Sequence, residues 1–276
     1  MDGQARLKPL PQERPQPGEE EYLAELIRLK VEPAPLEVLL AAESGPLEPE
    51  SSLPRGEVDR LCDPAPLENP HYWSRMQDLS VRVSNETPMP DLSREMIEWW
   101  FDWHSRRSQR YRVWHPVAHF ANGRAPAAQP AVKPYWGVSN FPVEDVGDGA
   151  ASIRIDFTSP REFGFTDDYL DDDSVATIVC ARVGDRLIEH TFMAHVFLRD
   201  GDGLRLRSHF WIAEKVRPRL PGPASVMAGP IQSLVSNRYV RKVAVPDQVG
   251  RTLLVHCSEE YQHLNRILPG LYERFA

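Results

Sequence analysis

The 276-residue sequence is poor in cysteine, in basic charge and in long apolar runs, and each shortage excludes a class of protein. Its three widely spaced cysteines form neither a disulfide framework nor a Cys-x-x-Cys metal knuckle. Its 32 Lys and Arg residues are outnumbered by 40 Asp and Glu residues, and the net charge of −8 argues against binding to nucleic acid. No apolar run approaches the roughly 18 residues of a membrane-spanning helix, and the N-terminus lacks the apolar core of a secretory signal. We therefore expect a cytoplasmic protein without a nucleic-acid or membrane partner.

Common catalytic motifs are also absent. The sequence has no G-x-S-x-G nucleophile elbow, no P-loop and no G-x-G-x-x-G after a strand. Cys257 directly follows His256, but neighbouring side chains on a helix diverge by about 100°, so these two do not form a nucleophile–base pair.

Proline is abundant and unevenly distributed, with 26 prolines against 16 glycines and many of the prolines before residue 91. We expect residues 1–20 to form a disordered Pro-rich tail, because they hold too little apolar surface to offset the entropy of ordering them. Residues 21–90 mix short apolar pieces with proline, which predicts a helical and extended segment packed on a main domain at 91–276.

The main domain has the pattern of an antiparallel sheet followed by a long helix. Apolar and aromatic positions recur at helical spacing from N-cap residues 91–93 to about residue 105. Alternating and β-branched runs between 151 and 212, separated by tight turns, predict strands that form a meander. A terminal helix is expected from near Val255, with a bend at Pro269. This order predicts an α+β fold whose curved sheet encloses a cavity against the helix.

The terminal helix carries the best local signal for a metal site. His256 and Glu260 are four positions apart and share a face with Leu253 and Leu264, which should point inward. A carboxylate in an apolar cavity is costly unless it is paired or bound to a metal, and imidazole and carboxylate are good zinc ligands. The alternative is that His256 and Glu260 are a solvent-exposed side-chain pair without a metal. The i, i+4 spacing by itself favours this alternative.

Other candidate residues have equally plain alternatives. His115 and His119 are also four apart, but Pro116 disfavours one continuous helix through them. His195 lies in a strand with two apolar faces, so it is either a buried residue with a backbone partner or a proton carrier or ligand in the cavity. Glu144 precedes a strand and is either a loop carboxylate or a ligand.

Three blocks together resemble a known family: MIEWWFDWHSRRSQRYRVWHPVAHFAN, LRLRSHFWI and HCSEEYQHLNRILPGLYERF. They resemble the 2,4-diacetylphloroglucinol hydrolases and the related phloretin hydrolases, over a stretch from about Pro33 to the C-terminus. The resemblance implies a Bet v 1/START-like helix-grip fold, with 91–276 as the catalytic domain. It also implies a zinc-dependent hydrolase of a small aromatic ketone, in which water activated by the metal attacks the acyl carbonyl and the carbon–carbon bond to a phloroglucinol-type ring breaks.

The resemblance also implies roles for single residues. The implied metal ligands are His119, Glu144, His256 and Glu260, a donor set that also admits iron or manganese. His195 matches an active-site histidine, either a ligand or an acid–base residue. Tyr111 and Asn122 match residues that bind phenolic hydroxyls.

Two positions depart from the family pattern and put the substrate in question. Phe210 stands where a substrate-binding tyrosine is expected, and His209 where an arginine is expected. The competing functions are a non-catalytic small-molecule binder with the same cavity and an interaction protein built on the acidic, Pro-rich front half. Neither explains the grouped His and Glu positions as well as a hydrolase does. A homodimer is one assembly we consider.

Overall fold

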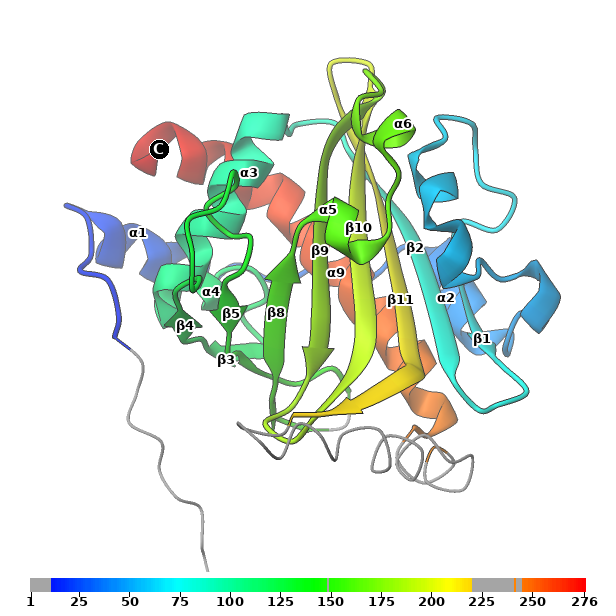
Figure 1. Cartoon of the computed structure of the whole chain (residues 1–276). Coiled ribbons are helices and arrows are strands. Elements are labelled where there is room, and N and C mark those ends of the chain that lie inside the picture. The colour runs from blue at the N-terminus through cyan, green and yellow to red at the C-terminus, as the bar shows by residue number, and fades with distance from the viewer. Residues whose placement is uncertain (1–10, 148, 220–240, 242–244) are drawn as a thin grey trace, which may run out of the picture.

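The computed structural model describes residues 11–147, 149–219, 241 and 245–276, and it consists of a curved antiparallel sheet packed on one long helix (Figure 1). The main sheet has the strand order β1-β2-β11-β10-β9-β8-β5-β4. These strands are β1 Tyr72–Arg75, β2 Val81–Met89, β4 Arg124–Ala125, β5 Ser139–Asn140, β8 Arg154–Thr158, β9 Val175–Gly184, β10 Ile188–Asp200 and β11 Gly203–Pro218. The predicted α+β helix-grip architecture is confirmed.

A second, three-stranded sheet and several helices complete the described structure. The small sheet consists of β3 His119–Ala121, β6 Val143–Glu144 and β7 Ala151–Ser152. The α-helices are α1 Glu19–Leu26, α2 Leu36–Glu43, α3 Arg94–Trp103, α4 Ser108–Arg112, α5 Pro160–Phe163, α6 Asp167–Leu170 and α9 Asp247–Phe275, and the 3₁₀ turns are η1 Pro49–Ser51, η2 Arg55–Cys62 and η3 His104–Arg106. Within the described residues, no helix combines the length and apolar character that crossing a membrane requires.

The alternation of side chains along β10 and β11 creates two cores, one on each face of the sheet. Phe197 and Phe210 belong to the core shared with α9, whereas Phe192 and Trp211 pack in a second core with η2 and α5. The same alternation puts His209 opposite to Phe210, on the outer face beside Tyr72, where its ring lies 4.3 Å from that of Trp211. The histidine that replaces the expected arginine at position 209 therefore lies away from the inner face of the sheet. Of the two substituted positions, only Phe210 can contact a ligand between the sheet and α9.

Helix α9 begins at Asp247, earlier than the expected start near Val255, and it continues through Pro269 to Phe275. Its first turn, Asp-Gln-Val-Gly, has little apolar periodicity, so the sequence pattern does not reveal it. Gly250 lies in this turn because a Cβ there would come within about 3.1 Å of Trp73 and Val81. The missing side chain lets the start of α9 pack closely on β1 and β2.

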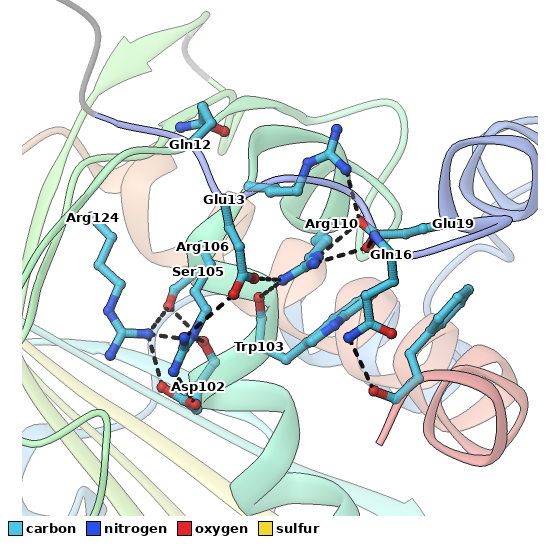
Figure 2. Close-up of polar contacts among 12 residues, drawn as sticks. Gln12, Glu13, Gln16, Glu19, Asp102, Trp103, Ser105, Arg106, Arg110 and Arg124 are labelled. Atoms are coloured by element: carbon cyan, nitrogen blue, oxygen red, sulfur yellow. Dashed lines mark hydrogen bonds and ion pairs between the residues drawn. The ribbon is translucent and has the colours of Figure 1, made fainter.

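The N-terminal segment differs from the expected tail over the part that the structure describes. Residues 1–10 lie outside the described residues, but residues 11–20 lie against α3 and α4 (Figure 2). Arg110 and Glu19 are both fully buried and form a two-bonded ion pair, with N···O distances of 2.9 and 2.8 Å. Glu13 contacts Arg110 at 2.5 Å, and Gln12 accepts a hydrogen bond from the Ser108 backbone. Paired charges, rather than apolar area, order this segment, which is why composition did not predict it.

We expect Glu19→Gln to destabilise the fold strongly, because it leaves the buried Arg110 short of a counter-charge. Breaking a buried ion pair costs about 3–5 kcal/mol, and the free energy of unfolding from denaturant titration measures the loss. Glu43→Gln is the matched control, since Glu43 pairs with Arg251 at a site where its side chain is 72% exposed. That change should stay within about 0.5 kcal/mol, and equal losses in both variants would contradict this account of the N-terminal segment.

Candidate metal centre

Two structural units bring the predicted ligands together. His119 opens β3 and Glu144 closes β6, and the two residues are direct partners in the antiparallel ladder of the small sheet. His256 and Glu260 lie one turn apart on α9, so they share the face of the helix that meets this sheet. The indole of Trp114, in the segment between α4 and β3, donates a 3.1 Å hydrogen bond to the Glu260 carbonyl and so ties the chain that leads into the small sheet to α9.

The terminal atoms of His119, Glu144 and His256 lie within 4.8 Å of one another, and Glu260 approaches both histidines. His119 Nε2 lies 3.4 Å from His256 Nε2, 3.7 Å from a Glu144 oxygen and 3.6 Å from a Glu260 oxygen. His256 Nε2 lies 3.8 Å from the same Glu260 oxygen. Ligands at 2.0–2.2 Å around a tetrahedral ion are separated by about 3.3–3.6 Å, so the spacings around His119 Nε2 are close to those of ligands that share one small cation. Among the described residues, His119, Glu144 and His256 form the only group of three or more His, Cys, Asp or Glu residues compact enough to hold a metal.

The electrostatics of the group also fit a cation. Burial raises the pKa of Glu144, and burial together with the nearby Glu144 carboxylate raises that of Glu260 well above its ordinary value. Burial lowers the pKa of His256 to about 3 and that of His119 well below its ordinary range, so both imidazoles are neutral. No described Lys or Arg pairs with either carboxylate. Two buried carboxylates without a positive partner are unfavourable, and a divalent ion supplies the missing charge.

Neighbouring residues orient these side chains. The Tyr111 hydroxyl donates to Glu144, and the Tyr111 ring stacks on His119 with centroids 4.2 Å apart and planes 8° apart. His119 Nδ1 lies 3.3 Å from the Tyr111 carbonyl, which can only accept, so Nδ1 carries the proton and Nε2 presents a lone pair to the group. His115 stacks on His256 but has its Nε2 3.4 Å from Glu259, outside the group.

A cavity of about 190 Å³ lies beside the group, and most of its wall is apolar. Glu144, His256 and Glu260 reach its wall, as do Tyr111 and Asn122. His195 and Phe210 line it from the sheet, with their ring centroids 5.6 Å apart. The cavity therefore collects every predicted site residue except His119, which lies behind Tyr111.

His195 and Asn122 have defined partners at this wall. His195 Nδ1 lies 2.8 Å from the Ser208 hydroxyl, and burial lowers the pKa of His195 to about 3. The Asn122 amide donates a 3.0 Å hydrogen bond to the Ser105 carbonyl, while its Oδ1 is buried without a partner among the described residues. His195 can therefore accept or relay a proton, and Asn122 can accept a hydrogen bond, while neither side chain carries a charge.

The comparisons with known proteins show the family of the chain. The family model described as the DAPG hydrolase PhiG domain matches residues 53–273. The chain belongs to this family. It is 29% identical over 248 residues to the phloretin hydrolase of Eubacterium ramulus, covering 87% of this chain and 85% of that protein. It is 26% identical over 256 residues to the 2,4-diacetylphloroglucinol hydrolase of Pseudomonas protegens, covering 88% of this chain and 81% of that protein.

Solved structures overlap with this DAPG hydrolase family member only loosely. A START superfamily protein from Mycobacterium smegmatis matches with a TM-score of 0.31 and 12% identity, covering 60% of this chain and 97% of that chain. An overlap of this size does not bear on the site.

Four polar residues on the cavity wall were not predicted as site residues from the sequence: His104, Asn140, His190 and Thr191. His104 could have been found, because it follows Trp100 by four positions in the aromatic helix motif. Asn140 lies in a two-residue strand, where no periodicity reveals which side chain points inward.

The raised pKa of Glu260 gives a testable dependence of stability on pH. A carboxyl whose folded-state pKa is raised keeps its full contribution at low pH and loses it as the pH rises from about 4.5 through the folded value. We therefore expect Glu260→Gln to stabilise the metal-free protein at about pH 8 and to give no gain near pH 4. Urea unfolding in the presence of a chelator measures the difference. Glu273→Gln on the exposed side of the same helix is the control, and a gain that is the same at both pH values would contradict the buried, unpaired carboxyl.

Proposed function

We propose that this chain is a metal-dependent hydrolase that cleaves the carbon–carbon bond between a phloroglucinol-type ring and an acyl group, and that its ion is zinc. The observation that carries the proposal is the compact group of His119, Glu144 and His256, with Glu260 close to both histidines, beside an apolar cavity in a chain of the DAPG hydrolase family. The cavity volume of about 190 Å³ supports a single-ring substrate, because a cavity of about 150 Å³ already binds benzene.

The reaction consumes one water molecule for each bond cleaved. Water delivers its oxygen to the acyl carbon, the bond from that carbon to the ring breaks, and the ring carbon takes up a proton. The products are a carboxylic acid and the deacylated ring. A divalent ion held by His119, Glu144, His256 and Glu260 would lower the pKa of water and polarise the acyl carbonyl. Ring hydroxyls assist departure, because the negative charge of the leaving ring then resides on oxygen.

The side chains around the cavity have distinct parts in this reaction. We assign Tyr111 and Asn122 to the ring hydroxyls, because both line the cavity and Asn122 Oδ1 has no described partner. We assign His195 to the proton transfer. Ser208 occupies its Nδ1, so Nε2 is the nitrogen left for the substrate, and the neutral ring can take up or return a proton there.

A carrier protein with the same cavity is the competing function. Without an ion, it would keep Glu144 and Glu260 buried with no positive partner among the described residues. Burying these carboxyl groups costs free energy whether they stay charged or take up a proton with a raised pKa, and a carrier of neutral ligands does not need them. The distribution of charge therefore favours the hydrolase.

His256→Ala should lose the divalent ion and acyl–ring cleavage together, because it removes one of two neutral imidazole ligands. The loss of metal affinity should exceed the roughly 10–100-fold caused by removing an outer partner of a ligand. His115→Ala is the control, since His115 stacks on His256 but lies outside the group. Metal content by plasma mass spectrometry and product analysis by chromatography measure both effects. Full metal content with unchanged cleavage in His256→Ala would sink the proposal.

Phe210→Tyr should improve turnover of substrates that carry a hydroxyl near this part of the wall. One new hydrogen bond is worth about 0.5–1.5 kcal/mol, so kcat/KM should rise about 2- to 10-fold for such substrates relative to analogues lacking the hydroxyl. Phe157→Tyr, at another position on the cavity wall, is the control for merely adding a hydroxyl. An unchanged ratio of kcat/KM values across the hydroxylated analogues would count against the assignment of Phe210.

A further inference from the structure

His104 is a buried histidine on the cavity wall to which the reaction described above gives no part. It directly follows α3, its residue is 2% exposed, and its ring stacks on Trp100 with centroids 4.9 Å apart and planes 22° apart. Tyr111, which holds Glu144, stacks near the same ring with centroids 6.1 Å apart. Aromatic neighbours thus fix the position of His104 at the edge of the site.

The hydrogen bonding of His104 determines which of its nitrogens carries the proton. Nδ1 lies 2.6 Å from the Trp100 carbonyl, and a carbonyl can only accept. Nδ1 is therefore the donor, and Nε2 of the neutral ring is an acceptor with no partner among the described residues. Burial lowers the pKa of His104 to about 4, which keeps the ring neutral at physiological pH.

Asn122, which directly follows β3, repeats this arrangement. Its amide donates to the Ser105 carbonyl at 3.0 Å, and its Oδ1 remains unpartnered. Both side chains therefore use their donors on backbone carbonyls next to α3 and leave their acceptors for the cavity. Asn140, whose strand pairs with β4 through Arg124, adds a third polar side chain with a buried, unpartnered Oδ1. A buried acceptor without a donor costs about 1–3 kcal/mol. A ligand whose hydroxyl groups donate to these acceptors would remove that cost, so this end of the cavity favours such a ligand.

We propose that His104 determines substrate specificity: its Nε2 accepts a hydrogen bond from a ring hydroxyl, next to the hydroxyl bound by Asn122. This inference rests on the proposed function for the identity of the ring. The cavity then selects rings with two or more free hydroxyls, of the resorcinol or phloroglucinol type. An O-methylated ring is rejected, because a methoxy oxygen has no proton to donate and its methyl group needs additional space.

The test compares His104→Phe with His104→Gln in the metal-loaded protein. Phenylalanine keeps the aromatic stack on Trp100 but has no acceptor, whereas the Gln side-chain oxygen can replace Nε2. The substrates are 2,4,6-trihydroxyacetophenone and its mono-O-methyl ethers at positions 2 and 4. Wild type should prefer the free hydroxyl over at least one ether by about tenfold in kcat/KM. That ratio should fall toward one in His104→Phe and be retained in His104→Gln, with metal content unchanged in both.

A binding measurement separates failure of this inference from failure of the proposed function. Calorimetry with phloroglucinol and 3,5-dimethoxyphenol compares free and methylated hydroxyls without requiring turnover. If wild type cleaves none of the ketones, the hydrolase proposal fails, but a preference for phloroglucinol that His104→Phe loses still supports His104. If wild type has no preference in either assay, or if His104→Phe keeps the full preference, the role of His104 is overturned. If His104→Phe does not fold, His104→Met, which also lacks a nitrogen or oxygen acceptor, takes its place in both assays.

Discussion

Two carboxylates buried without a cationic side chain are the constraint on which the arrangement of the site depends. Glu144 and Glu260 come from different units, the small sheet and α9. Glu144 lies within 4 Å of the neutral imidazole of His119, and Glu260 lies within 4 Å of those of both His119 and His256. The two carboxylates repel each other when both are ionised, and a cation between them would remove this repulsion. The surrounding contacts hold the group together in advance: the β3–β6 ladder, the stack of Tyr111 on His119 and the bond from Trp114 to α9. The candidate metal centre is therefore preorganised by ordinary packing and hydrogen bonding.

The short helix α4 connects this centre to the N-terminal segment. Arg110 turns toward Glu13 and Glu19, where buried charges of both signs compensate each other (Figure 2). The next residue, Tyr111, turns the other way and bonds Glu144. The charges around Arg110 are thus neutralised by side chains of opposite sign. The carboxyl groups of Glu144 and Glu260 have no such partner among the described residues, which suits the binding of a cation. Ordering of residues 11–20 supports the position of α4 and so, indirectly, that of Tyr111.

Much of the fold could be predicted from periodicity, but the finer parts of the site could not. Long strands such as β10 and β11 alternate over many residues, and α9 carries a regular apolar stripe, so the meander and the helix were evident. The start of α9 was missed because its first turn is polar and ends in Gly250. Glu144 lies in a strand of two residues, and only its pairing with His119 brings it into the group. The family resemblance pointed to Glu144 where local pattern did not. His104 has its acceptor exposed to the cavity only because Nδ1 is bound to the Trp100 carbonyl, a detail of tertiary structure that a sequence pattern does not encode.

X-ray absorption spectroscopy of the zinc-loaded protein tests the central claim most directly, because the spectrum counts the ligand atoms and identifies imidazoles. The account predicts one ion per chain with two imidazole nitrogens and oxygen ligands at about 2.0–2.2 Å, and no sulfur. A chain that binds no ion, or a spectrum with thiolate ligands or fewer than two imidazoles, would contradict it.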